Sequence, residues 1–115
     1  MSLQRTNQEV TYLQETEVLA KYAKALGHPA RIKILNYLAS QSCCYTGELV
    51  DVLQLAQSTI SQHLKELKSA GLIQGQVEPP KIRYCIHASN WKKAQELFNQ
   101  FFDKNCCLGS CGNEN

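Results

Sequence analysis

The sequence has no long run of apolar residues, which excludes a helix that spans a membrane. Its first six residues, Met1 to Thr6, have neither the basic start nor the apolar stretch of a secretory signal peptide. We therefore expect a cytoplasmic protein without a membrane partner, in a compartment that keeps thiols reduced. The sequence also has no internal repeat, and 115 residues leave room for one domain with a modest core.

A large charge of either sign is also missing. The chain has 12 Lys and Arg against 10 Asp and Glu, a formal net charge of +2. This charge is too small to indicate nucleic-acid binding by composition, so a DNA-binding surface requires positive charge gathered on one face. A hydrophobic content of 43% and a charged content of 19% are typical of a folded domain rather than a disordered chain.

Helical periodicity is present from the N-terminus onward. A capping-box pattern at Thr6 opens a first helix that Gly27 ends, and Pro29 suits the first turn of a second helix. Residues 40–45 form a connection, and a short third helix starts at Thr46. The apolar positions of these three helices are Leu19, Tyr22, Ala23, Leu26, Ile32, Leu35, Leu38, Ala39, Leu49 and Leu53.

A fourth helix starts near Gln57 and is closed by Gly71, a C-terminal glycine cap. The apolar period then changes from helical to two, which indicates two strands joined by a hairpin loop at residues 75–80. Ser89 is expected to cap a last helix. The apolar positions are Ile60, Leu64 and Leu67 in the fourth helix, Leu72, Ile73, Ile82, Tyr84 and Ile86 in the strands, and Trp91, Ala94, Phe98 and Phe101 in the last helix.

This order predicts a winged helix-turn-helix fold, mainly α with a two-stranded β-hairpin wing. We expect one domain over residues 1–115, folded from about residue 6 to 105, with a flexible cysteine-bearing tail at residues 108–115. The fold needs no cofactor.

The fourth helix is the expected DNA-reading element. Its apolar stripe leaves hydroxyls, amides and a lysine on the other arc, and such groups can contact bases and phosphates. Any solvated helix has a polar face, so the interpretation depends on the short helix before it and the basic hairpin after it. The expected DNA contacts are Gln57, Ser58, Thr59, Ser61, Gln62, His63 and Lys65 on the helix, and Lys81 and Arg83 on the hairpin.

Four stretches of the chain closely resemble the ArsR/SmtB family of bacterial repressors that respond to metals, metalloids or thiols. They are Ala25–Leu35, Gly47–Leu49, Gln57–Leu67 and Ala70–Ile73. The resemblance covers about Val18 to Phe102 and implies a homodimer, joined by the first and last helices, that binds an inverted-repeat operator in double-stranded DNA until an inducer releases it. Ala56 stands where the family often has a Ser that caps the reading helix.

The resemblance does not name the inducer. Many arsenic and cadmium sensors of the family have a Cys-Val-Cys-Asp-Leu motif, where this chain has Tyr45 to Leu49. The last helix contains no His, so a zinc site there is not expected. Some arsenic sensors of the family have a vicinal cysteine pair and a third cysteine after this helix. This chain has a similar arrangement in Cys106, Cys107 and Cys111.

Three thiolates complete the coordination shell of trivalent arsenic, so As(III) is the expected inducer, bound by the three tail cysteines. Cys43 and Cys44 are less certain additional ligands, from the same subunit or its partner. Soft thiolates also suit Cu(I), Zn(II) and Cd(II). Cys85 is expected to be a packed strand residue.

Three other interpretations remain open for the cysteines. The vicinal pairs could form a redox or persulfide sensor on the same repressor fold. The tail could have no sensing role. A thiol-dependent enzyme needs an activated cysteine, but Cys106 and Cys107 follow a helix C-terminus, where the helix dipole raises the pKa of a thiol. We therefore expect no enzyme.

Overall fold

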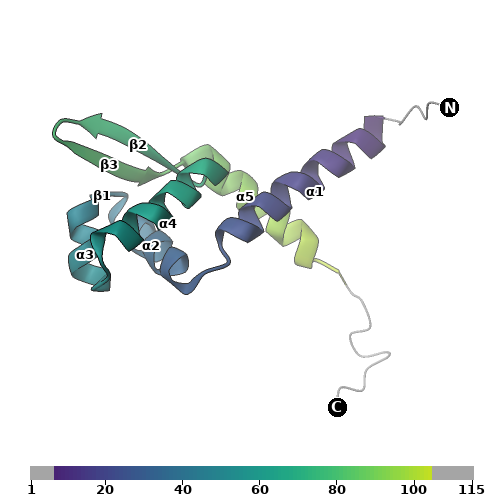
Figure 1. Cartoon of the computed structure of the whole chain (residues 1–115). Helices are drawn as coiled ribbons and strands as arrows, with labels where there is room; N and C mark the ends of the chain where they lie inside the picture. Colours follow the sequence, from purple (N-terminus) through teal and green to yellow (C-terminus); the bar gives the residue numbers. More distant parts are fainter. Residues whose placement is uncertain (1–6, 105–115) are drawn as a thin grey trace, which may run out of the picture.

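The computed structural model describes residues 7–104, and their side chains from residue 13 onward. The elements follow the predicted order, with one additional strand (Figure 1). They are α1 (Asn7–Ala25), α2 (Pro29–Gln41), β1 (Cys43–Tyr45), α3 (Thr46–Leu53), α4 (Gln57–Ala70), β2 (Ile73–Glu78), β3 (Lys81–Ile86) and α5 (Ala88–Phe102).

The sheet has three antiparallel strands in the order β1-β3-β2. The segment expected as a connection contains β1, which pairs with the otherwise open edge of β3 so that Cys43 faces Cys85. The wing, which we define as β2 and β3 with their turn, has a shorter loop than expected. Both strands extend to Pro79-Pro80, which end the ladder because proline has no backbone N–H.

The core lies between α2, α3, α4 and the sheet. Most of the expected apolar positions are buried or partly buried against the core, but Ala23, Ile82 and Phe101 are exposed. In addition, α2 is turned differently from the prediction. Ile34 is fully buried, whereas Ile32 is 40% exposed and Ala39 is exposed. Ile32 lies about 200° around the helix from Ile34, so the two side chains cannot share a face. The buried residues of α2 are Ala30, Ile34, Leu35 and Leu38.

Two polar contacts fix where α5 begins. The predicted cap, Ser89, lies within the helix, and the cap is His87, whose Nδ1 accepts from the backbone N–H of Asn90 at 3.2 Å. The side-chain amide of Asn90 donates to the carbonyl oxygen of Gly71 at 2.9 Å. Gly71 has the left-handed backbone (φ 89°) that ends α4. Thus the end of α4 and the start of α5 are tied together.

Helices α1 and α5 pack against each other and extend away from the wing (Figure 1). Tyr22 and Ala25 of α1 and Leu97 of α5 are buried, but large apolar side chains further along both helices are exposed. They are Leu13, Phe101 and Phe102. None of the described helices is both long enough and apolar enough to cross a membrane.

The burial of Leu64 in α4 gives a stability prediction. Leu64 is 1% exposed, so Leu64→Ala leaves a cavity and should lower the free energy of unfolding by about 2–5 kcal/mol. The neighbouring exposed Lys65→Ala is the control and should change it by less than about 0.5 kcal/mol. Urea denaturation measures both, and equal effects of the two substitutions would contradict the placement of α4.

Candidate DNA-binding surface

The polar face of α4 is open to solvent. Ile60, Leu64 and Leu67 are buried at 0–1% exposure, as expected, and they hold the helix against the core. On the other arc the structure exposes six of the seven predicted side chains: Gln57, Ser58, Thr59, Ser61, Gln62 and Lys65. Gln62 also donates to Glu66 at 3.1 Å, which orients its amide along the helix.

A short turn places α4 against α3. Gln54 ends α3 in the left-handed conformation (φ 55°), and its backbone N–H donates to the carbonyl oxygen of Val50 at 2.8 Å. Ala56 precedes α4 in the N-cap position and offers no side-chain cap, as the sequence implies. The first backbone N–H groups of α4 therefore have no side-chain cap, at the same end as Gln57 and Ser58.

His63 is not part of the exposed face, which corrects the prediction that it contacts DNA. It is 8% exposed, and the centroid of its ring lies 4.4 Å from the centroid of the His28 ring. Arg31 Nε donates to its Nδ1 at 3.3 Å. Burial first, and then the nearby His28 and Arg31, lower the pKa of His63. The neutral ring is thus the form that fits this position.

Arg31 connects three helices through its guanidinium. Besides His63 of α4, its guanidinium donates to the carbonyl oxygen of Ala25 at the end of α1, at 3.2 Å. Arg31 itself lies in the first turn of α2, and His28 caps that turn by accepting from the backbone N–H of Ala30. We name His28, Arg31 and His63 the histidine joint, because they link α4 to α1 and α2.

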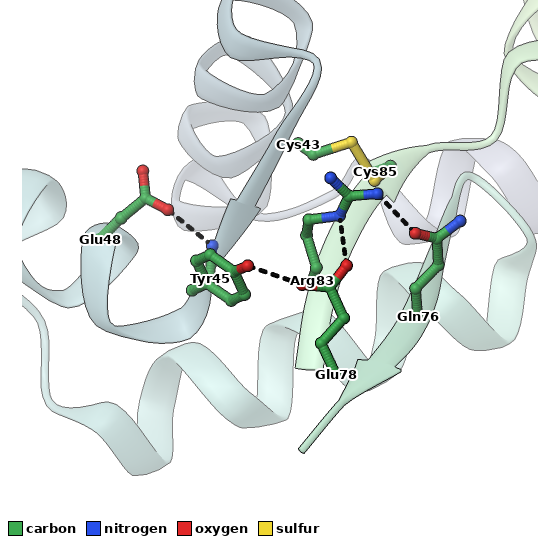
Figure 2. Close-up of polar contacts among 7 residues, drawn as sticks. All are labelled: Cys43, Tyr45, Glu48, Gln76, Glu78, Arg83 and Cys85. Carbon is green, nitrogen blue, oxygen red and sulfur yellow. Dashed lines mark hydrogen bonds and ion pairs between the residues drawn. A yellow bond between two sulfur atoms is a disulfide. The ribbon is translucent and has the colours of Figure 1, made fainter. Parts of the chain in front are cut away.

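The two predicted cations of the wing differ in their partners. Lys81 is exposed, with Nζ 5.1 Å from the centroid of the Tyr45 ring. Arg83 is engaged within the sheet: its Nε lies 3.3 Å from Glu78 Oε2, and its Nη2 donates to Gln76 Oε1 at 2.6 Å (Figure 2). In this geometry Lys81 fits the predicted phosphate contact, while the charge of Arg83 is neutralised by Glu78.

Helix α4 and the wing face a common groove of about 510 Å³. Gln57 and Ser61 stand on its helix side and Lys81 on its wing side, while the first turn of α3 forms the floor together with Tyr45. The predicted helix and hairpin contacts are therefore brought to one surface, although they are separated in the sequence.

Cys43 and Cys44 point to opposite faces of β1 and do not form a shared ligand pair. Cys43 is joined to Cys85 in a disulfide, whereas Cys44 is 1% exposed in the core. Burial first, and then the charge of Glu48, raise the pKa of Cys44 to about 11, so its thiol stays protonated. Both are thus unsuited as metal ligands in this conformation.

The predicted ligands Cys106, Cys107 and Cys111 lie outside the described residues. Within residues 7–104 no group of three or more His, Cys, Asp or Glu side chains could hold a metal ion.

Sequence reasoning missed Arg31, which contacts the buried His63, and also Tyr45 and Glu78, which lie beside Arg83 of the wing. The alternation of β3 does place Arg83 and Cys85 on one face, but their partners depend on the register of β1 and β2. A two-residue loop at Pro79-Pro80 would have set the β2 register and placed Glu78 beside Arg83.

Comparisons with known proteins agree with this architecture. Residues 28–74 match the family described as "Bacterial regulatory protein, arsR family". The HTH-type transcriptional regulator YgaV of Escherichia coli is 37% identical over 79 residues, which cover 68% of this chain and 80% of YgaV.

Two solved structures are similar in fold. HlyU from Vibrio cholerae has a TM-score of 0.63 and 28% identity, covering 77% of this chain and 96% of HlyU. The transcriptional repressor PagR of Bacillus anthracis has a TM-score of 0.60 and 27% identity, covering 78% of this chain and 99% of PagR.

The histidine joint predicts a stability that depends on pH. Since the pKa of His63 is lowered by folding, the unfolded chain takes up a proton first when the pH falls below about 6.5. The joint should therefore stabilise the fold above that pH and lose its contribution as the pH falls through the lowered pKa. His63→Gln keeps an acceptor for Arg31 but does not titrate. Urea denaturation should show that the free energy of unfolding falls more between neutral and mildly acidic pH in the wild type than in His63→Gln. Equal losses in the two proteins would refute the lowered pKa of His63.

Proposed function

Because the chain belongs to the ArsR family of bacterial regulatory proteins, we propose that it is a transcriptional repressor that binds operator DNA as a homodimer and releases it on binding a soft metalloid, As(III) above all. As a member of this family it is a DNA-binding regulator of transcription and not an enzyme. The operator, the dimer and the inducer are the parts of the proposal that experiments must test.

The observation that carries the proposal is the groove shared by α4 and the wing. The major groove of DNA admits one α-helix, and amides and hydroxyls on its exposed face can bond to base edges. Gln57, Ser61 and Gln62 supply such groups, and Lys81 supplies a cation for the phosphate backbone. Helix α4 would therefore read the bases while the wing contacts the adjacent backbone.

The exposed apolar ends of α1 and α5 support a homodimer. Phe101 is 48% and Phe102 73% exposed, and Leu13 of the facing helix is 38% exposed. Between these helices lies an open cleft of about 300 Å³ with Leu19 and Leu97 in its walls. A second copy of the chain would cover these side chains and place two α4 helices for an inverted repeat, whose symmetry matches that of a dimer.

The donor set in the tail supports As(III) as the inducer. Cys106, Cys107 and Cys111 provide three thiolates within six residues. Three is the number of thiolates that a pyramidal As(III) centre binds. Because Cys44 is buried and Cys43 faces Cys85 across the sheet, we assign the proposed site to the three tail cysteines. Sb(III), Cd(II), Zn(II) and Cu(I) are thiophilic ions to compare with it.

A second candidate is the same repressor responding to oxidants or persulfides. The disulfide between Cys43 and Cys85 favours it, because this pair can take up and release two electrons. This candidate predicts release of DNA by an oxidant, and no release by arsenite under reducing conditions.

Substitution of Gln62 tests the reading helix. A bidentate amide contact to a base is worth about 1–3 kcal/mol, so Gln62→Ala should weaken operator binding roughly 5- to 150-fold. Gln95→Ala on the exposed side of α5 is the matched control and should leave affinity unchanged. Fluorescence anisotropy on duplexes tiled across the gene's upstream region measures both. If Gln62→Ala binds like the control, α4 does not read the bases through Gln62.

Arsenite titration tests the tail site. Reduced wild-type protein bound to the same duplex should be released by arsenite, whereas Cys106→Ser/Cys107→Ser should bind equally well and stay bound. Zinc serves as the comparison ion. Release of the double variant at the wild-type arsenite concentration would exclude these cysteines as the sensing site.

A further inference from the structure

The disulfide encloses the entire DNA-binding unit. Cys43 on β1 and Cys85 on β3 face each other with 4.1 Å between their Cα atoms and a sequence separation of 42. The chain between them comprises α3, α4, β2 and the wing turn. One reversible covalent bond therefore joins the strand that leads into α3 to the strand that carries the wing cations.

We propose that Cys43 and Cys85 form a redox switch that controls whether Arg83 of the wing can contact DNA. This switch is separate from the tail cysteines and goes beyond the proposed inducer, although it rests on the proposed DNA-binding function. The oxidised pair keeps Arg83 bound within the sheet, and the reduced pair releases it to a DNA phosphate.

A chain of contacts leads from Tyr45, which is close to the disulfide in sequence, through Glu78 to Arg83 (Figure 2). Tyr45 lies two residues after Cys43, and it pairs with Arg83 as Cys43 pairs with Cys85. Because side chains two residues apart on a strand point to the same side, these four side chains share one face of the sheet. The Tyr45 hydroxyl donates to Glu78 Oε1 at 2.7 Å, and Glu78 Oε2 lies 3.3 Å from Arg83 Nε. The hydrogen bond to Glu78 is also the main cause that raises the pKa of the Tyr45 phenol. Tyr45 thus orients the carboxylate that neutralises Arg83.

The position of Tyr45 depends on how β1 is held. This strand has only three residues, and short ladders at a sheet edge open readily. The disulfide holds it to β3 two residues from Tyr45. When the two thiols are free, β1 keeps its backbone ladder, the buried Cys44 and the bond from the Tyr45 backbone N–H to Glu48, but it loses its covalent tie to β3. The Tyr45 side chain is then less firmly placed, and the Glu78 carboxylate loses one of its two partners.

The ion pair of Arg83 with Glu78 is partly exposed, although Arg83 Nε itself is buried. The two side chains are 38% and 43% exposed, respectively. Pairs near the surface contribute little free energy, so small changes in their surroundings can open them. A nearby DNA phosphate then competes with Glu78 for the guanidinium, which binds phosphate in a bidentate geometry. Loosening Tyr45 favours the phosphate in this competition.

The redox step balances with a peroxide as the oxidant. The Cys43 thiolate, on the less buried side of the pair, attacks a peroxide oxygen and becomes a sulfenic acid. The Cys85 thiol then attacks that sulfur, the S–S bond forms and water leaves. Hydrogen peroxide takes the two electrons and two protons of the thiols and yields two waters, and a small dithiol returns them. Cys44 takes no part, because it is buried on the opposite face.

The test compares operator binding by the oxidised and reduced full-length chain in which Cys106, Cys107 and Cys111 are replaced by Ser. Peptide mapping by mass spectrometry verifies the Cys43–Cys85 bond after peroxide treatment. The reduced form should bind the duplex roughly 5-fold more tightly, and its affinity should fall more steeply with salt, by about 0.9 in log–log slope for each additional phosphate that it neutralises. Cys43→Ser/Cys85→Ser in the same background should behave as the reduced form with or without peroxide.

Arg83→Gln is the variant that isolates the mechanism. It should bind like the oxidised form in both redox states, with the smaller salt slope. The proposal is overturned if oxidised and reduced chains bind alike, if peroxide forms no Cys43–Cys85 bond, or if Arg83→Gln retains the difference. Failure of both forms to bind any upstream duplex would instead refute the proposed DNA-binding function, so the two failures are distinguishable.

Discussion

Burial of one apolar stripe on α4 determines the remainder of the DNA-binding surface. Ile60, Leu64 and Leu67 are almost completely buried, and each contributes about 1.5–3 kcal/mol by leaving water. With that stripe held against the core, the rotation of the helix about its axis is set, and the side chains that face the groove follow from it. The exposed face can therefore vary in sequence while its position in the fold remains the same.

Polar contacts then place the other elements relative to α4. The histidine joint connects α4 to α1 and α2, and Asn90 connects its C-terminal end to α5 through the Gly71 carbonyl. Tyr45 connects β1 to the wing through Glu78. These bonds thus tie together elements of the proposed dimer contact, in α5, and of the proposed DNA contact, in α4 and the wing.

Helix order, the glycine-capped end of α4 and its apolar stripe could be predicted because they depend on neighbours within a few residues. His63 could not be placed, because it stands at the flank of the helical wheel and only its contact with Arg31, 32 residues away, decides that it is buried. The strand β1 and its disulfide were missed because a three-residue strand has too little pattern, and its partner is 42 residues distant. The pairing of Arg83 with Glu78 was missed because the hairpin loop was expected to be longer.

Helix α4 and the wing, and not the α1–α5 end of the molecule, form the proposed surface that meets DNA. Backbone NMR of the ¹⁵N-labelled protein titrated with an upstream duplex distinguishes these two surfaces. The predicted result is a set of shift changes centred on Gln57 to Lys65 and on Lys81, with His63 affected less than its exposed neighbours. Changes centred on the outer ends of α1 and α5, with α4 unaffected, would contradict the proposed surface.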